Sequence, residues 1–312
     1  MKAIETRNLT KRFGRTTAVR DLNLSIPTGA VFGFLGRNGA GKTTTIRMLM
    51  GHLHPGKGDV SVLGSCPWTH RAETLQRIAY VSDRMSLPGW MTASKLIAMG
   101  EGLFPRWDSS LAVKLLSDFG LPRNGRFRDL SLGQQRKTLI LSALCQSADL
   151  LILDEPTVGL DVESRHQFLE RILDIACQEG RTVFLSSHLL SDVERVVDQI
   201  GVIRNGSMVY QGDMEELKSS VRRLQITEQV EASVLSEHFT VVSCDITSQG
   251  TDATVTQFTD QALAQFAARL QHADAVHCHG FNLEELYLQL SGPVPSATQS
   301  VAVTEHESRV VP

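Results

Sequence analysis

The residues from Gly36 to Thr44 carry the clearest chemical signal in the chain. Glycines at the first and sixth positions, followed by Lys42 and Thr43, fit a loop whose backbone N–H groups surround a phosphate. Glycine has no Cβ, so the backbone can approach an anion closely, and a helix that begins there adds partial positive charge. We expect Lys42 to reach the outer phosphates of a nucleotide and the Thr43 hydroxyl to hold Mg²⁺; the alternative is a glycine turn that binds nothing. The residues predicted to bind the nucleotide are Arg37, Asn38, Gly39, Ala40, Gly41, Lys42, Thr43 and Thr44.

Two carboxylates and a histidine follow apolar runs further along the chain. Asp154 and Glu155 end the run 150–153, and His188 ends the run 182–187. Such runs are typical of strands buried on both faces of a parallel sheet, whose active sites gather at the C-terminal strand ends. We expect Asp154 to bind Mg²⁺ through water, Glu155 to act as the general base or orient an attacking water, and His188 to hydrogen-bond the γ-phosphate. Each residue alone also fits a capping or structural role, but the combination with the glycine loop favours catalysis.

The composition is that of an ordinary globular protein. A length of 312 residues allows one large domain and a smaller one, and a net charge of −3 gives no electrostatic reason to expect nucleic acid as a partner. The five cysteines are scattered and odd in number, so we expect no disulfide framework and a reducing compartment. No signal-peptide core is visible, and no apolar stretch approaches the roughly 20 residues that span a bilayer. We therefore expect a cytoplasmic protein, with any membrane crossing supplied by another chain.

Hydrophobic periodicity predicts an α/β core with two additions. Residues 3–9 and 22–26 are expected to be strands of an antiparallel N-terminal sheet. Residues 92–102 and 109–120 have helical periodicity and are expected to form a helical subdomain inserted into the core. The expected strands of the core itself are 30–35, 78–82, 150–154 and 182–188.

The pattern changes after about Lys218. The expected order of elements there is β-α-β-β-α-β, with Thr259 capping the second helix and a last helix over 282–290, which is the order of a split βαβ sandwich. The tail has Pro, Ser and Thr without apolar periodicity and is expected to be disordered. The predicted domains are 1–217 for the α/β domain, 218–291 for a small α+β accessory domain and 292–312 for the tail.

Several histidines and a cysteine cluster near the end of the accessory domain: His272, His277, Cys278 and His279. His277 and His279 would share one face of a strand and could bind a transition metal. The alternative is a polar strand edge without a ligand, which is the reading that we prefer.

From about Ala3 to Glu216 the sequence resembles the nucleotide-binding subunits of ABC transporters. The glycine loop is similar to the Walker A motif of this family, and Leu151–Glu155 is similar to Walker B. Leu130–Gln134 resembles the signature L-S-G-G-Q, with Leu132 in place of one glycine; this is the most discriminating match, since many phosphate-loop proteins lack it. The remaining matches are Gly159–Asp161 with the D-loop, His188 with the switch histidine and Phe13 with the adenine-stacking aromatic residue. Its place at the end of a strand upstream of the loop also suits stacking on an adenine ring, and the alternative for Phe13 is a small core residue.

The resemblance implies an α/β fold with a P-loop NTPase core, an antiparallel β subdomain and an inserted helical subdomain. It implies ATP and Mg²⁺ as cofactors and a head-to-tail dimer, either a homodimer or a pair with a related ATPase subunit. ATP would lie between the Walker A loop of one subunit and Ser131, Gly133 and Gln134 of the other. Phe104–Asp108 and the ending Asn282–Tyr287 look most like exporter-type ATPases, which work with a separately encoded membrane permease at the inner face of the cell membrane.

One position departs from the family in a way that touches the chemistry. Asp83 stands where the family usually has Gln, and it adds a charge where a neutral amide would meet the metal and the water. We expect Asp83 to join Thr43 and Asp154 as a metal ligand.

A soluble ABC ATPase that acts on ribosomes or DNA, uncoupled from transport, is the alternative function. Translation-factor types carry two cassettes in one chain, and DNA-repair types insert a long coiled coil between the loop and the signature. The sequence shows one cassette and only a short helical insertion, which favours transport.

Overall fold

The computed structural model describes residues 1–270 and 275–291, and it divides into two compact units. The first unit contains Met1–Lys218 together with Asn282–Leu290, and the second is built from Ser219–Phe281. The expected disordered tail, 292–312, and His272 lie outside the described residues. None of the helices in the described ranges is long and apolar enough to cross a membrane.

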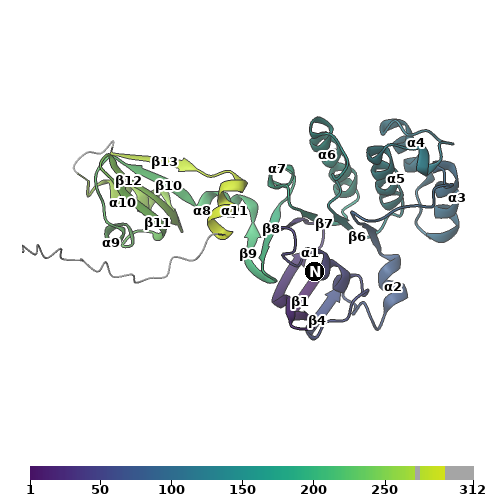
Figure 1. Ribbon diagram of the computed structural model, residues 1–312, viewed down its shortest axis with the longest axis horizontal. Helices are drawn as coiled ribbons and strands as arrows, with labels where there is room; N and C mark the ends of the chain where they lie inside the picture. Colours follow the sequence, from purple (N-terminus) through teal and green to yellow (C-terminus); the bar gives the residue numbers. More distant parts are fainter. Residues whose placement is uncertain (271–274, 292–312) are drawn as a thin grey trace, which may run out of the picture. The chain divides into compact units, whose positions relative to one another are not determined.

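A six-stranded sheet forms the centre of the first unit (Figure 1). Its neighbouring strands are parallel except for the last pair, an antiparallel hairpin that turns at Asn205–Gly206. The strands that run through the middle have both faces covered, which explains their continuous apolar sequences. In spatial order the strands are β5 (Ile78–Val81), β6 (Leu150–Asp154), β7 (Thr182–Ser187), β3 (Val31–Leu35), β8 (Gln199–Arg204) and β9 (Ser207–Asp213).

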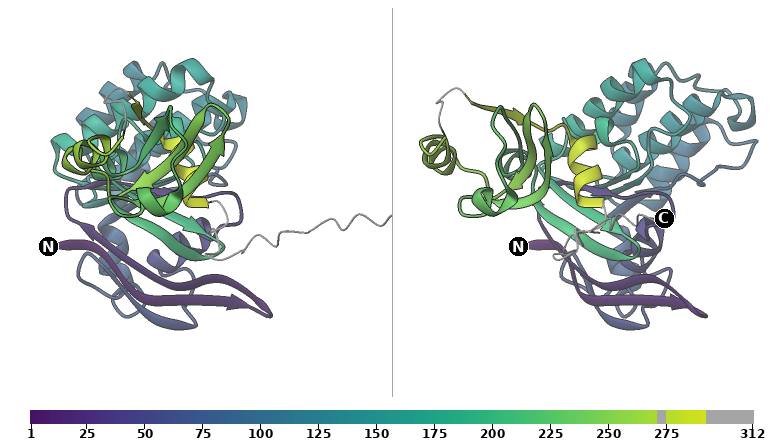
Figure 2. Two further views of the ribbon diagram at one scale, coloured as in Figure 1. Left: turned by 90° about the vertical axis from the view of Figure 1, so that its left-hand side faces the viewer. Right: turned by 60° about the vertical axis from the view of Figure 1, so that its left-hand side comes forward.

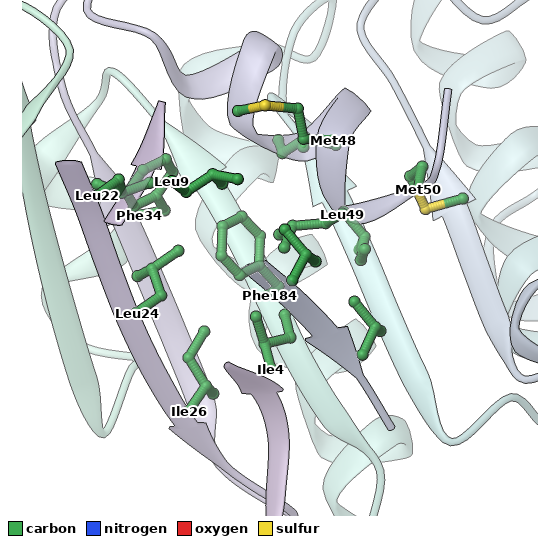
Figure 3. Close-up of a cluster of buried hydrophobic side chains, with 14 of the residues drawn as sticks. Ile4, Leu9, Leu22, Leu24, Ile26, Phe34, Met48, Leu49, Met50 and Phe184 are labelled. Carbon is green, nitrogen blue, oxygen red and sulfur yellow. The ribbon is translucent and has the colours of Figure 1, made fainter. Parts of the chain in front are cut away.

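A second, antiparallel sheet packs over the N-terminal part of the core. It has the order β2-β1-β4, with β1 (Lys2–Phe13) and β2 (Thr16–Pro27) forming the long purple strands in Figure 2 and β4 (Lys57–Val62) at the edge. Helix α1 (Lys42–Leu49) contributes Met48 and Leu49 to the hydrophobic cluster shared with both sheets (Figure 3). Phe184 lies in this cluster, and its ring centroid is 5.3 Å from that of Phe34. The strand and the helix that flank the glycine loop are therefore anchored in one core.

The inserted helices lie between β5 and β6 in sequence, as the periodicity predicts. Thr92 and Asp108 each accept a hydrogen bond at the N-terminus of their helix, which fixes where these helices begin. The helices of this subdomain are α3 (Ala93–Leu103), α4 (Ser109–Asp118), the 3₁₀ turn Phe127–Asp129 and α5 (Leu132–Cys145). The other helices of this part of the chain are α2 (Arg71–Gln76), α6 (Val162–Gln178), α7 (Leu190–Val193) and α8 (Met214–Ser220).

The second unit has the predicted split βαβ arrangement. Its four antiparallel strands have the order β11-β12-β10-β13, and Phe239 and Phe266 lie in its buried cluster. Thr259 caps the second helix, as the sequence predicts. Its elements are β10 (Arg222–Ile226), α9 (Ala232–Leu235), β11 (Thr240–Thr247), β12 (Gly250–Thr256), α10 (Asp260–Ala267) and β13 (Val276–Gly280).

The last helix, α11 (Leu283–Ser291), corrects one predicted boundary. We expect it in the accessory domain, but Asn282–Leu290 belong to the first unit, so the predicted domain 218–291 is wrong at its C-terminal end. Leu283, Leu286 and Tyr287 of this helix are buried, and the Tyr287 hydroxyl accepts a hydrogen bond from the backbone of Arg37. A sequence pattern shows that such a face must be buried, but not which unit covers it.

Two of the accessory-domain histidines singled out in the sequence, His277 and His279, lie on strand β13. His277 and His279 are exposed on β13, opposite Gln225 and Arg223 of β10. Within the described ranges, no group of three or more His, Cys, Asp and Glu side chains is arranged to hold a metal ion.

Two glycines of α3 give a matched test of packing in the helical subdomain. A Cβ at Gly100 would lie 2.4 Å from the ring of Trp107, whereas a Cβ at Gly102 would meet nothing within 4 Å. Gly100→Ala should therefore destabilise the protein by about 1–3 kcal/mol through overpacking. Gly102→Ala should be neutral or stabilise it by up to about 1 kcal/mol through helix propensity. Thermal unfolding of both variants measures the difference, and equal midpoints would show that the contact with Trp107 does not limit packing.

Candidate nucleotide-binding site

At two positions of the loop between β3 and α1, no residue larger than glycine fits. A Cβ at Gly36 would lie 2.6 Å from the Ile203 carbonyl oxygen, and one at Gly41 would lie 2.7 Å from the Ala18 carbonyl oxygen. Gly41 also has φ 113°, which side chains strongly disfavour, and it immediately precedes the first residue of α1. The loop is thus held against two neighbouring strands and ends at a helix N-terminus, where an anion is stabilised.

Most backbone N–H groups of this loop have no hydrogen-bond partner among the described residues. In the part of the chain that the structure describes, no hydrogen-bond partner is found for the N–H groups of Asn38, Gly39 and 41–44. Ala40 differs, because its N–H donates to the Arg37 carbonyl oxygen at 3.0 Å. The loop lines a cleft of about 460 Å³, which Asp83, Arg84 and Glu155 also line. A concave set of free N–H donors of this kind binds phosphate.

Lys42 connects the loop to the end of β6. Its Nζ atom donates to the Gly36 carbonyl oxygen at 2.6 Å and lies 3.4 Å from Oε1 of Glu155, and the side chain is only 6% exposed. A buried ammonium needs such partners, because an unpaired buried charge is costly. Lys42 is therefore held between the loop and Glu155, the carboxylate that the sequence predicts to be catalytic.

Asp154 is buried beside the first turn of α1. The Thr43 hydroxyl donates to Oδ2 of Asp154 at 3.3 Å, and the Ser186 hydroxyl donates to Oδ1. Burial raises the pKa of the Asp154 carboxyl, the Ser186 hydrogen bond acts against this, and the charges of Asp83 and Glu155 raise the pKa further. The Thr43 hydroxyl and the carboxylates of Asp83 and Asp154 are hard oxygen donors, which suit Mg²⁺.

Glu155 and His188 meet at the ends of neighbouring strands. Oε2 of Glu155 lies 2.7 Å from Nδ1 of His188 and accepts a hydrogen bond from the His188 backbone N–H at 3.3 Å. Glu155 has φ 53°, a left-handed conformation that is strained for a residue with a side chain and is often found at functional sites. The turn aims the two oxygens of the carboxylate at different partners, Lys42 and His188.

The backbone at Asp83 is fixed by a residue that the sequence analysis missed. Arg136 of α5 is buried, and its guanidinium donates to the Ser82 carbonyl oxygen at 2.6 Å and to the Asp83 carbonyl oxygen at 2.9 Å. The Asp83 side chain remains partly exposed, with Nε of Arg84 at 3.8 Å. An arginine two residues after the signature was the only available signal, and its burial could not be deduced from the sequence.

The signature residues do not line this cleft. Ser131 is the N-cap of α5, and Ser131 and Gln134 form a reciprocal capping box. Leu132, the residue that departs from the family pattern, is 73% exposed. It packs beside Gly159 of the D-loop, since a Cβ added to Gly159 would lie 3.4 Å from the Cβ of Leu132. Within one chain, the predicted Ser131, Gly133 and Gln134 are thus separate from the loop that they are expected to complete.

Phe13 also lies outside the cleft residues, at the end of β1. It is 52% exposed, with the Lys11 ammonium 5.5 Å from its ring centroid, so it is not a core residue. The structure thus brings together Lys42, Thr43, Asp83, Asp154, Glu155 and His188, and leaves Phe13 and the signature on other surfaces of the chain.

Comparisons with known proteins agree with this geometry. The family model described as ABC transporter matches residues 19–158. The chain is 34% identical over 256 residues to the bacitracin transport ATP-binding protein BcrA of Bacillus licheniformis, covering 79% of this chain and 83% of that protein. It is 30% identical over 311 residues to the linearmycin resistance ATP-binding protein LnrL of Bacillus subtilis, covering 93% and 98%.

A solved structure confirms the predicted fold. It is a dimeric ATP-binding cassette in a post-hydrolysis state with ADP and phosphate bound, and it has a TM-score of 0.60 at 21% identity, covering 68% of this chain and 98% of the other. The shared fold, the matching family model and the two bacterial relatives lead to one conclusion. The chain belongs to the ATP-binding subunits of exporter-type ABC transporters.

Proposed function

We propose that this chain binds ATP with Mg²⁺ at the Gly36–Thr44 loop and hydrolyses it to drive a separately encoded membrane permease. The observation that carries the proposal is the convergence of Lys42, Glu155 and His188 on a loop in which most N–H groups find no partner among the described residues. A glycine turn without a ligand would have no need of free donors beside a buried lysine. The residues present fit the nucleotide, since the loop supplies anion donors and Thr43 and Asp154 supply oxygen ligands for the metal.

Bound Mg²⁺–ATP supplies the phosphoryl group that is transferred to water. In this chain the loop N–H groups and Lys42 would hold the phosphates, while Thr43 and Asp154 would hold the cation. Glu155 accepts a proton from water or orients it, as a carboxylate at this position can. His188 fixes one oxygen of that carboxylate and can also reach toward the phosphate.

The second wall of the site is proposed to come from another subunit. Ser131, Gly133 and Gln134 are exposed or half-buried at the start of α5 and lie outside the cleft of their own chain. A head-to-tail pair would place them opposite the loop of the partner, and both sites would be completed at once. The partner is a second copy of this chain or a related ATPase subunit, and the dimeric cassette with the same fold supports such an assembly.

The permease is proposed to dock on the loop that follows Asp83. Trp90 is 60% exposed, and Met85, Met99 and Leu103 are also exposed in this part of the chain. Single exposed apolar residues are common, so the proposal depends on how closely Met85 and Trp90 follow the active-site residue Asp83 in sequence. The chain would then sit at the cytoplasmic face of the membrane, and the names of its relatives, which refer to bacitracin transport and linearmycin resistance, favour export over a soluble ATPase.

Glu155→Gln tests the catalytic carboxylate. The change keeps the shape of the side chain but removes its basicity, so ATP should still bind while hydrolysis slows by about 10²–10⁴-fold. Because the bridging phosphate then persists, the variant should accumulate as an ATP-bound dimer, whereas Lys42→Ala should lose ATP binding and stay monomeric. Phosphate release and light scattering with ATP and ADP measure both properties.

Glu170→Gln, the same chemical change at a surface residue paired with His166, is the control and should leave hydrolysis unchanged. Hydrolysis by Glu155→Gln at the parental rate would show that another group activates the water. If Glu155→Gln hydrolyses ATP slowly but stays monomeric with ATP, the catalytic role of Glu155 stands. The partner would then be a related ATPase subunit rather than a second copy of this chain.

Trp90→Glu tests the docking surface. Nζ of Lys95 lies 5.1 Å from the Trp90 ring centroid, so a carboxylate can be accommodated beside this lysine without disturbing the fold. We expect basal ATP hydrolysis to be kept and both transport and stimulation by the co-expressed permease to be lost. Val209→Glu on β9, another exposed apolar position, is the control. Normal transport by the Trp90→Glu protein would exclude this loop as the docking site.

Asp83→Gln tests the departure from the family pattern. If Asp83 holds Mg²⁺ through water, replacing its charge by a neutral amide should raise the Mg²⁺ concentration needed for half-maximal hydrolysis. If its charge instead repels the γ-phosphate, the variant should turn over faster at saturating Mg²⁺. A titration of hydrolysis against Mg²⁺ separates the two outcomes, and identical curves for both proteins would eliminate both roles.

A further inference from the structure

The C-terminal helix α11 has a defined start and a buried face. Asn282 and Glu285 form a reciprocal capping box, in which the Asn282 N–H donates to Glu285 at 3.0 Å and the Glu285 N–H donates to Asn282 at 2.9 Å. Leu283, Leu286 and Tyr287 follow at helical spacing and are buried on one face. The helix therefore docks in a fixed register on the first unit, of which it is a part.

Tyr287 uses this register to reach the phosphate-binding loop. Its side chain is 8% exposed, and its hydroxyl oxygen accepts a hydrogen bond from the backbone N–H of Arg37 at 3.0 Å. Arg37 lies 250 positions earlier in the chain and is the second residue of the loop. Its carbonyl oxygen in turn accepts from the Ala40 N–H at 3.0 Å.

These two hydrogen bonds hold the backbone of Arg37 on both sides. Its N–H is bound by Tyr287 of α11, and its carbonyl oxygen is bound by Ala40 of the loop itself. The N–H groups of Asn38, Gly39 and 41–44 have no hydrogen-bond partner among the described residues and are available to phosphate. The direction in which these donors point therefore depends on the position of Arg37, which in turn depends on the docked C-terminal helix.

We propose that Tyr287 is a positioning residue of the phosphate-binding loop and that docking of α11 is thermodynamically coupled to nucleotide binding. This proposal rests on the proposed ATP site and adds to it a control element from the far end of the chain. Coupling of this kind is reciprocal: if α11 improves nucleotide affinity, the nucleotide must stabilise the docked helix by the same factor. The second unit lies between Lys218 and Asn282 in sequence. A ligand that binds this unit would therefore change nucleotide affinity through the docking of α11.

Tyr287→Phe removes only the hydroxyl and keeps the buried ring, so the variant should fold. Loss of one hydrogen bond to the loop should weaken binding of Mg²⁺–ATP by about three- to tenfold. The KM for ATP should rise by a similar factor, while kcat at saturating ATP stays near the parental value, because no group at the reacting atoms has changed.

Tyr210→Phe is the matched control, since it removes a hydroxyl that donates to the Asp213 carbonyl oxygen on β9 and does not touch the loop. The two variants should have similar unfolding temperatures without nucleotide, and only Tyr287→Phe should lose nucleotide affinity. A merely structural role would lower the unfolding temperature and leave the KM unchanged.

Hydrogen exchange of the α11 amides measures the reciprocal effect. Mg²⁺–ATP should slow exchange in this helix of the parental protein, and should do so less in Tyr287→Phe. Two results together would overturn the inference, provided that the parental protein binds ATP. Tyr287→Phe would bind ATP as tightly as the parental protein, and hydrogen exchange of the α11 amides would be the same with and without nucleotide. A parental protein that binds no ATP at all would instead overturn the proposed function.

Discussion

The close approach of the glycine loop to two carbonyl oxygens is the constraint on which the rest of the structure depends. The main chain at Gly36 touches the Ile203 carbonyl of β8, and at Gly41 it touches the Ala18 carbonyl of β2. The hairpin turn closes the same cluster, since the Gly206 N–H donates to the Ala40 carbonyl oxygen at 2.9 Å. Both sheets, the turn and α1 must therefore pack as one body around the loop. An added methyl at either loop glycine would push these elements apart.

Charge is the second organising factor, and it works against stability until a ligand arrives. Asp83, Asp154 and Glu155 raise local negative charge at one edge of the sheet, and burial and neighbouring carboxylates raise the pKa of Asp154. Lys42 offsets part of this charge through its contact with Glu155. A divalent cation with a nucleotide would neutralise the remainder while its phosphates take over the free N–H donors. Clustered carboxylates and free N–H donors favour ligand binding over folding stability, which is the usual trade between stability and function.

Sequence reasoning succeeded where the signal is local. The glycine loop, the apolar strands 150–153 and 182–187, and the Thr259 cap are each set by neighbouring residues, and the structure has them at these positions. Strands β1 and β2 extend beyond the predicted ends because exposed residues such as Arg12 pair across the hairpin without leaving an apolar pattern. The roles of Arg136 and Tyr287 could not be predicted, because each depends on which distant backbone group a buried side chain meets. The placement of α11 failed for the same reason.

The central proposal is that each nucleotide lies between the phosphate-binding loop of one subunit and the signature of another. If the partner is a second copy of this chain, mixing two inactive variants tests the proposal most directly. Lys42→Ala has an intact signature, and Ser131→Arg has an intact phosphate-binding loop. In an equal mixture, half of the dimers should contain both variants and thereby rebuild one complete site, so hydrolysis should return to about a quarter of the parental rate. Full activity of Ser131→Arg alone, or no recovery in the mixture, would contradict a site shared between two copies of this chain.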